Sequence, residues 1–326
     1  MIISKTPLRI SYVGGATDRP CYYKKHGGAV INVAIDKYIY VTVNSRFDGK
    51  IHLRYSKTEE VNCPEELEHS IARECLKEAG INKGVEIVIV SDVPTKGCGL
   101  GSSSALTVGL LNALYAFKGC RAKLNTLAEK ACKIEIESLK SPIGKQDQYA
   151  CAYGGFNLFS FIQDGSVLSE DLLVSSNYEK VKWLEEATLL FYLGKGRDTN
   201  GILKDYEEGC EMDKVKVLDG IKLLVYDMKT WLQNGVDEHV IGRIVDTGWE
   251  LKKQMSNKTS DYYIDELYQK TMKAGACGGK VVGAGGGGFL MVIAEPKVQH
   301  YVREELKDLK EMKFKFEEYG SRLYYV

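Results

Sequence analysis

Hydrophobic and polar residues alternate near the start of the chain in the pattern of β-strands. Leu8, Ile10 and Tyr12 fall on one side of an extended backbone, because successive side chains of a strand point to opposite faces. Arg9 falls on the other side. A second alternating apolar run spans residues 31–43. We therefore expect two strands here, with the Arg9 side chain directed away from the apolar face of the first.

The rest of the chain is predicted to contain helices and strands in runs. In the first half, helical spacing of apolar residues and short apolar runs indicate helices at residues 64–79, 102–118 and 124–138, and strands at residues 85–90 and 155–162. In the second half, a strand at residues 189–193 precedes long helices between residues 202 and 274. The chain then ends with a strand, a glycine run, a strand, a helix and a strand. Because strands and helices do not alternate strictly, we expect the α+β class in both halves.

The length of the chain favours two domains. A chain of 326 residues is long for a single hydrophobic core. The polar segment around residues 170–182 is the best candidate for the join. We therefore expect one domain at residues 1–180 and another at residues 181–326.

Charge and composition favour small-molecule chemistry. Lys plus Arg equals Asp plus Glu at 44 each, so no strong overall field would attract nucleic acid or an anionic membrane. The N-terminal residues lack the pattern of a secretion signal, and no apolar run approaches the length of a membrane span. We expect a cytoplasmic protein, either a monomer or a homodimer. The five histidines, His239 among them, are isolated in the sequence, so no histidine cluster suggests a metal centre.

The segment from Pro94 to Ala105 combines glycines and serines where a strand should lead into a helix. Gly97, Gly99 and Gly101 allow the backbone to approach an anion closely. The serines at 102–104 would occupy the first turn of the helix, whose free N–H groups favour negative charge. The pattern is neither a Walker A loop nor a protein-kinase glycine loop. It predicts a phosphate-binding loop, although a flexible loop with serine helix caps stays an alternative.

A glutamate lies on the apolar face of the predicted helix at residues 124–138. Leu127 and Ala131 define a stripe at helical spacing, and Glu135 continues it. A buried carboxylate needs a cation or strong hydrogen-bond donors. Beside a phosphate-binding loop, the natural partner of Glu135 would be Mg²⁺, which prefers oxygen ligands.

An aspartate follows Glu135 by twelve residues. Asp147 comes just after Pro142 and Gly144, which should break the helix before a new turn. Its position suggests a general base that orients a hydroxyl group and accepts its proton during phosphoryl transfer. Arg9 is a candidate to hold this carboxylate ionised. The alternative is that Asp147 only caps a helix.

The glycine run at residues 283–288 formally contains the spacing of a dinucleotide-binding motif. A strand rather than a helix is predicted after it, from Phe289 onward, which argues against a Rossmann site. We expect these glycines to join two strands and to permit close approach of a ligand or of the first glycine loop.

Taken together, four segments resemble the GHMP kinases. They are Pro7–Asp18, Pro94–Ala105, the pair Glu135 and Asp147, and Gly283–Gly288. The resemblance implies an N-terminal domain with a mixed sheet and the phosphate-binding loop, and a C-terminal ferredoxin-like domain. It also implies that ATP and Mg²⁺ bind between the two domains.

The resemblance also implies roles for single residues. Asp147 is expected to be the catalytic base with Arg9 beside it, and Ser103 and Glu135 are expected to bind Mg²⁺. The residues expected to bind the ATP phosphates are Gly97, Gly99, Leu100, Gly101, Ser102, Ser103 and Ser104. Those expected to bind the substrate are Arg9, Gly14, Gly15, Asp18, Asp147, Arg197, Gly286 and Gly287.

Within the family, the N-terminal motif is most similar to that of sugar kinases acting on an anomeric hydroxyl. Galactokinases carry Glu-His where this chain has Gly15 and Ala16. Loss of the carboxylate would admit a sugar that carries a phosphate at its far end. The pattern resembles the D-glycero-D-manno-heptose 7-phosphate kinases, although Ala16 replaces an expected glycine. This implies formation of the 1,7-bisphosphate, for nucleotide-heptose synthesis and surface polysaccharide.

Two other functions stay open at this point. One is a kinase for an unphosphorylated sugar such as fucose, arabinose or galactose. The other is a non-catalytic regulatory protein with the same fold. The presence of Glu135, Asp147 and all three serines argues against the second.

Overall fold

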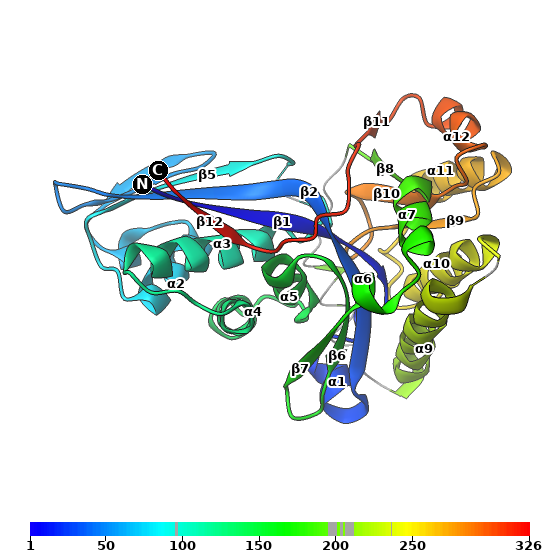
Figure 1. The fold of residues 1–326 in the computed structure, drawn as a ribbon, viewed down its shortest axis with the longest axis horizontal. Helices are drawn as coiled ribbons and strands as arrows, with labels where there is room; N and C mark the ends of the chain where they lie inside the picture. The colour runs from blue at the N-terminus through cyan, green and yellow to red at the C-terminus, as the bar shows by residue number, and fades with distance from the viewer. Residues whose placement is uncertain (95–96, 195–200, 203–204, 206–211, 236) are drawn as a thin grey trace.

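The first half of the protein is built on a mixed sheet of eight strands. The computed structural model describes residues 1–94, 97–194, 201–202, 205, 212–235 and 237–326. The long antiparallel pair β1 (Ile2–Val13) and β2 (Gly28–Ser45) forms the centre of the sheet (Figure 1). The remaining strands are β3 (Ile51–Arg54), β4 (Thr58–Val61), β5 (Val85–Ser91), β6 (Phe156–Phe161), β7 (Val167–Asp171) and β12 (Arg322–Tyr325). Among the described pairs of this sheet, only β3–β5 is parallel.

Helices cover one face of this sheet. They are α2 (Ser70–Ala79), α3 (Ser102–Phe117), α4 (Leu124–Cys132) and α5 (Gln146–Tyr153), and they lie together below β1 and β2 in Figure 1. Helix α3 packs directly on β1 and β2, and nearly all of its residues are buried. A short helix, α1 (Pro20–His26), connects β1 to β2. The glycine-rich loop and the start of α3 lie beside Arg9 of β1, whose backbone N–H donates to the carbonyl oxygen of Leu100.

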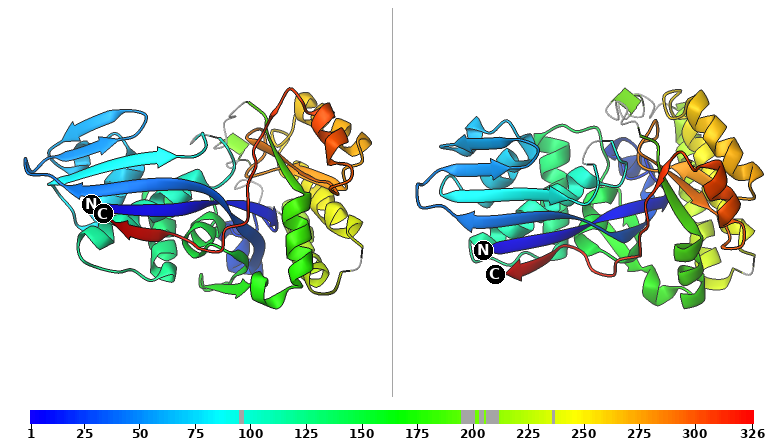
Figure 2. Two further views of the ribbon diagram at one scale, coloured as in Figure 1. Left: turned by 45° about the horizontal axis from the view of Figure 1, so that its top comes forward. Right: turned by 90° about the horizontal axis from the view of Figure 1, so that it is seen from above.

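The second half contains a four-stranded antiparallel sheet with the order β11-β8-β10-β9. Its strands are β8 (Thr188–Tyr192), β9 (Gly278–Val281), β10 (Phe289–Ile293) and β11 (Lys310–Glu311). In chain order this is 4-1-3-2, the order of a ferredoxin-like fold. The longer helices described in this half include α9 (Met212–Asn234), α10 (His239–Lys253) and α11 (Tyr262–Lys273), and the shorter α12 (Gln299–Glu305) precedes β11 (Figure 2). The expected α+β architecture with two sheets is confirmed.

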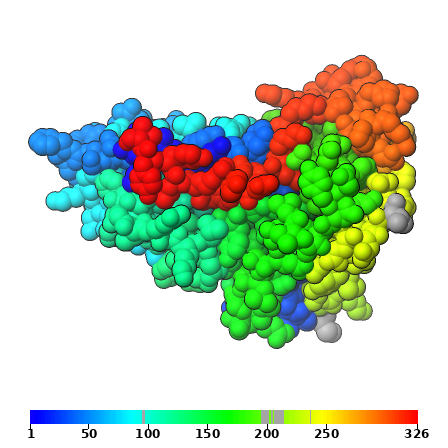
Figure 3. Space-filling view, viewed as in Figure 1, coloured from blue at the N-terminus to red at the C-terminus, as the bar shows by residue number. Residues whose placement is uncertain are grey.

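The C-terminal segment returns to the first half. Strand β12 pairs with β1, and the amino group of Met1 donates to the carbonyl oxygen of Val326 at 2.8 Å. Figure 3 shows this segment crossing the surface from the second half to the N-terminus. The first sheet therefore contains a strand from the region expected to form the second domain. The boundary predicted at residue 180 falls inside a helix, α7 (Tyr178–Ala187), which follows the short α6 (Leu172–Ser175).

Two predicted helices are divided in the structure. The segment at residues 64–79 consists of a 3₁₀ turn at Pro64–Glu66 followed by α2. The segment at residues 124–138 consists of α4 followed by a π-helical turn at Lys133–Ser138, which contains Glu135. Such π turns occur often at functional sites. None of the described helices is both long enough and apolar enough to cross a membrane, and the cytoplasmic location stays a prediction.

The two glycine runs pack against each other. Gly99 has φ +74°, and a Cβ atom on it would lie 2.5 Å from the carbonyl oxygen of Val282. A Cβ atom on Gly283 would likewise lie 2.6 Å from Cα of Gly99. Both positions need glycine because the neighbouring backbone leaves no space for a side chain. The start of the second glycine run therefore packs directly against the backbone of the first loop at Gly99.

A Gly99→Ala substitution should destabilise the fold strongly. It adds backbone collision to the cost of a left-handed alanine, which is about 1 kcal/mol alone, and overpacking adds about 1–3 kcal/mol. Gly119→Ala is the matched control, because Gly119 has φ +75° but a Cβ atom on it would meet nothing within 4 Å. Urea unfolding should give a larger loss for Gly99→Ala. Equal losses would contradict the close packing of the two runs.

Candidate active site

A cavity of about 750 Å³ lies where the two halves of the protein meet. It is lined by the end of β1, the glycine-rich loop, the start of α5, the end of α10 and the second glycine run. Of the predicted site residues, those that line it are Arg9, Gly14, Gly15, Asp18, Gly97, Gly99, Gly101, Ser102, Ser103, Glu135 and Asp147. The fold thus brings together in one cavity Arg9 and Asp147, which are 138 positions apart in the sequence.

Arg9 and Asp147 form a bidentate ion pair in this cavity. Nε of Arg9 donates to Oδ1 of Asp147 at 2.8 Å, and its Nη2 donates to Oδ2 at 2.6 Å. The third nitrogen, Nη1, donates to the carbonyl oxygen of Gly99 at 2.6 Å. Arg9 is buried, which by itself lowers its pKa, but the charge of Asp147 more than offsets this and the pKa is raised. Asp147 is 23 % exposed and lies in the first turn of α5.

The glycine-rich loop presents the N-terminus of α3 to the cavity. Gly97, Gly99 and Gly101 all have positive φ angles, and Gly101 is the residue that caps α3. The first-turn N–H groups of a helix and its positive end favour an anion at this place. Leu100 is fully buried and does not line the cavity, but its carbonyl oxygen accepts from the backbone N–H of Arg9 at 3.0 Å.

The three serines of the loop occupy different positions. Ser103 is exposed on the cavity side. Ser102 is buried, and its Oγ lies 3.0 Å from Sγ of Cys98. Ser104 is buried behind the cavity and donates to Oε2 of Glu135 at 2.7 Å. Of the three, only Ser103 therefore combines an exposed hydroxyl with a position near Glu135.

Glu135 is a buried carboxylate that lines the cavity. Its side chain is buried, and Oε2 accepts from Oγ of Ser104 and from Nε2 of Gln148, the latter at 2.6 Å. Burial raises its pKa to about 7, although hydrogen bonds from Ser104, Ser103 and Gln148 act in the opposite direction. Its described hydrogen-bond partners are neutral donors. This oxygen donor set, a carboxylate and a nearby serine hydroxyl, fits the preference of Mg²⁺.

Gly15 and Asp18 follow β1 and differ in accessibility. A Cβ atom on Gly15 would meet nothing closer than 3.6 Å, so this position has space for a side chain. Asp18 is buried, and its Oδ2 accepts from the backbone N–H of Gln146 at 3.0 Å while Oδ1 accepts from that of Ala16. Burial raises the pKa of Asp18. The Asp18 carboxylate thus fixes the start of α5 one residue before Asp147.

Two buried lysines line the cavity, and the sequence reasoning missed both. Nζ of Lys252, at the end of α10, donates to the carbonyl oxygen of Gly283, and Nζ of Lys280, in β9, donates to that of Tyr12 at 2.7 Å. Burial, together with the charge of Arg9, lowers the pKa of Lys252 to about 7, and that of Lys280 is also far below its usual value. Within the described part of the chain, neither lysine pairs with a carboxylate.

Other predicted substrate residues lie elsewhere. Gly286 and Gly287 are buried and do not line the cavity, whereas Gly283 and Ala284 of the same run do. Gly286 donates its N–H to the carbonyl oxygen of Thr259. Arg197 lies outside the described residues.

Comparison with known proteins agrees with this geometry. A model of the GHMP kinases N terminal domain matches residues 67–155, and a model of the GHMP kinases C terminal matches residues 239–313. The D-glycero-alpha-D-manno-heptose 7-phosphate kinase of Campylobacter jejuni is 30 % identical over 320 residues, which cover 94 % of this chain and 93 % of that protein. The L-fucokinase/L-fucose-1-P guanylyltransferase of Bacteroides fragilis is 27 % identical, and the match covers 94 % of this chain but 36 % of that protein.

A solved structure is also similar over the whole chain. The crystal structure of a D-glycero-D-manno-heptose 1-phosphate kinase from Bacteroides thetaiotaomicron superposes with a TM-score of 0.81 at 26 % identity, covering 100 % of this chain and 99 % of that one. Both halves of the fold, the cavity between them and these matches give one conclusion. The chain belongs to the GHMP kinase family and is an ATP-dependent kinase.

Proposed function

We propose that this kinase transfers the γ-phosphoryl group of ATP to the anomeric hydroxyl of a sugar phosphate, with D-glycero-D-manno-heptose 7-phosphate as the substrate and the 1,7-bisphosphate as the product. The observation that carries the proposal is the Arg9–Asp147 ion pair, which lies in the same cavity as the phosphate-binding loop. The similarity to a heptose 7-phosphate kinase supports the choice of sugar. The product would serve nucleotide-heptose synthesis for surface polysaccharide.

Asp147 acts as the general base in this mechanism. Its carboxylate orients the anomeric hydroxyl and accepts its proton as the oxygen attacks the γ-phosphorus. The new O–P bond forms while the bond to the β-phosphate oxygen breaks, and ADP leaves. Arg9 holds both carboxylate oxygens, so Asp147 has one orientation in the cavity.

The loop and the buried cations stabilise the transferring group. The N–H groups at the start of α3 and the Ser103 hydroxyl face the phosphates and reduce the negative charge that builds up during transfer. Ser103 and Glu135 would hold Mg²⁺, which when bound neutralises phosphate charge. Lys252 gains a favourable partner for its ammonium group when an anionic ligand enters the cavity.

The absence of a carboxylate at position 15 supports a phosphorylated substrate. Gly15 lines the cavity, where a Cβ atom on it would make only ordinary contacts, and basic side chains, among them Arg9, Lys252 and Lys280, line it as well. These features favour a ligand with more than one phosphate group. The fucokinase match keeps a free-sugar kinase as the competing function.

Substrate choice can be tested with two variants at position 15. Gly15→Glu adds a charged side chain and Gly15→Gln adds one of the same size without charge. The quantity to compare is the ratio of kcat/KM for heptose 7-phosphate to kcat/KM for fucose or galactose. This ratio should fall at least about tenfold further in Gly15→Glu than in Gly15→Gln, because the added carboxylate repels the phosphate group of the heptose. Wild-type protein that prefers a free sugar would overturn the proposed substrate.

Asp147→Asn tests the proposed base. We expect kcat to fall by roughly a hundredfold or more, the usual effect of losing a positioned base, with ATP affinity nearly unchanged. Asp164→Asn is the control, since Asp164 is exposed and bonds only to Ser166 among the described hydrogen bonds. Coupled assays and ATP titration measure the two effects. Near-normal turnover in Asp147→Asn would remove this residue from the role.

Glu135→Gln should stabilise the ligand-free protein in a pH-dependent way. The pKa of Glu135 is about 7 in the folded state against 4.5 when unfolded. The protonated side chain therefore favours the folded state fully below pH 4.5, and this contribution to the free energy of unfolding is lost as the pH rises to 7. The variant should therefore gain stability relative to wild type over this window, by up to about 3 kcal/mol. Denaturation at both ends of the window, without divalent cations, measures the gain. The exposed Glu137→Gln control should show none.

A further inference from the structure

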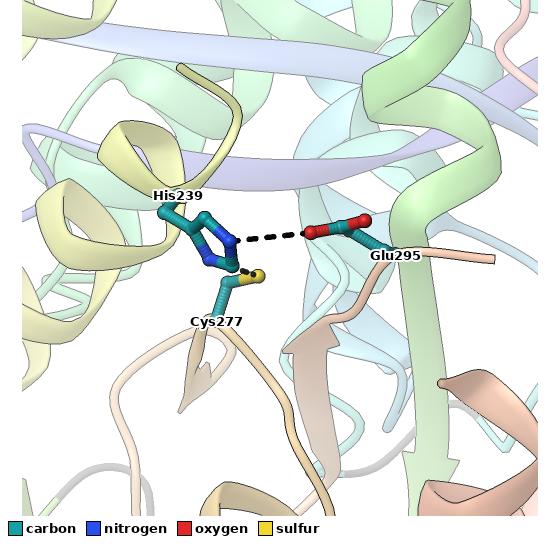
Figure 4. A group of neighbouring side chains, drawn as sticks. All are labelled: His239, Cys277 and Glu295. Carbon is teal, nitrogen blue, oxygen red and sulfur yellow. Dashed lines mark hydrogen bonds and ion pairs between the residues drawn. The ribbon is translucent and has the colours of Figure 1, made fainter. Parts of the chain in front are cut away.

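Three side chains with metal-binding atoms meet at the edge of the second half, away from the cavity. They are His239 at the start of α10, Cys277 just before β9 and Glu295 just after β10 (Figure 4). Sγ of Cys277 lies 3.3 Å from Nδ1 of His239, and Nε2 of His239 lies 3.3 Å from Oε1 of Glu295. One ligand atom of each residue lies within 4.8 Å of the others. None of the three lines the active-site cavity.

The backbone holds the three residues in place. The N–H of Cys277 donates to the carbonyl oxygen of Ile293 at 2.7 Å, which fixes the start of β9 beside the end of β10. Helix α10 packs closely on this point, because a Cβ atom on Gly242 would lie 2.3 Å from the carbonyl oxygen of Cys277. The N–H of His239 donates to Oδ1 of Asp237 at 2.9 Å. The three Cα positions are thus set by the sheet and the helix, and only side-chain rotation is left to complete a site.

Rotation of the side chains would give the spacing of a tetrahedral site. Bonds of about 2.3 Å to sulfur and about 2.0–2.2 Å to nitrogen and oxygen place neighbouring ligand atoms about 3.3–3.7 Å apart. An ion bonds to one ring nitrogen of His239, whereas Cys277 lies near Nδ1 and Glu295 lies near Nε2. With one ligand atom from each residue, the three atoms already lie within 4.8 Å of one another, so the side chains need only turn to meet at one ion. Glu295 also pairs with Lys297 at 2.7 Å, but the Lys297 side chain is 74 % exposed, and such surface pairs are weak. The carboxylate can therefore turn from Lys297 and from Nε2 toward an ion at little cost.

We propose that His239, Cys277 and Glu295 bind a zinc-like divalent ion. The mixed sulfur, nitrogen and oxygen set matches zinc chemistry and does not suit Mg²⁺, which prefers oxygen alone. Because His239 is 59 % exposed, solvent can supply a fourth ligand. The ion links α10 to the ends of two strands of the second sheet, so its role is to stabilise this half. The site does not depend on the substrate or on the kinase mechanism.

Cobalt can serve as the probe, because a thiolate bound to Co²⁺ gives a charge-transfer absorption band. The full chain, stripped of metal and without nucleotide, should bind a single equivalent of Co²⁺ with this band, and Zn²⁺ should displace it. Cys277→Ser should abolish the band, and His239→Asn or Glu295→Gln should weaken binding at least about tenfold. Cys120→Ser, which removes an exposed free thiol elsewhere, should leave it unchanged.

Thermal unfolding provides the second measurement. Zn²⁺ should raise the Tm of wild type and Cys120→Ser but not of Cys277→Ser or His239→Asn. Because His239 is mostly exposed, its variant should fold even if the cysteine variant does not, and kinase activity without added zinc checks folding in both. The proposal is overturned by wild-type protein without the Co²⁺ band, or by a band and stoichiometry that persist in Cys277→Ser and His239→Asn.

Discussion

The ion pair between Arg9 and Asp147 is the interaction on which the site depends. One arginine binds both carboxylate oxygens of Asp147 in α5 and also the carbonyl oxygen of Gly99 in the glycine-rich loop. A side chain from β1 thereby fixes the position of Asp147 relative to this loop. Removing either partner would leave a buried charge without its counterpart, which is far costlier than losing an exposed pair. The same contact therefore connects three elements of the fold and positions the Asp147 carboxylate in the cavity.

The cavity holds ionisable groups in environments that oppose their charge. Burial raises the pKa of Glu135 and lowers that of Lys252, each to about 7. Neither group has a full counter-charge within the described protein, so burying its charged form destabilises the fold. Ligands of opposite charge would favour the charged form of each group when they bind. The two groups therefore couple the stability of the protein to the charge of what binds in the cavity.

The sequence predicted the parts of the site that depend on local pattern. The period of the apolar residues placed Arg9 away from the core face and Glu135 on the inward stripe, and the structure has both positions. The same reasoning could have found Lys252, which continues the buried stripe of Ile241, Val245 and Trp249. The spacing of apolar residues could not distinguish the π turn at Glu135 from an α-helix, because over a single turn the two helices repeat at nearly the same interval. The pairing of β12 with β1 and the meeting of His239 with Cys277 join residues far apart in the chain, which local pattern does not encode.

Both halves of the fold supply groups to the cavity, and they supply different chemistry. The first half provides Asp147, the glycine-rich loop and Glu135, whereas Lys252 and Lys280 come from α10 and β9 of the second. Each lysine donates to a backbone carbonyl oxygen rather than to a carboxylate, so an anionic ligand in the cavity would favour the protonated form of both, whose pKa burial lowers. The glycine contact between Gly99 and Gly283 sets how closely the two halves approach at this point. A side chain at either position would push the halves apart and move Lys252 and Lys280 relative to Asp147, so the glycine runs shape the cavity although they carry no reactive side chain.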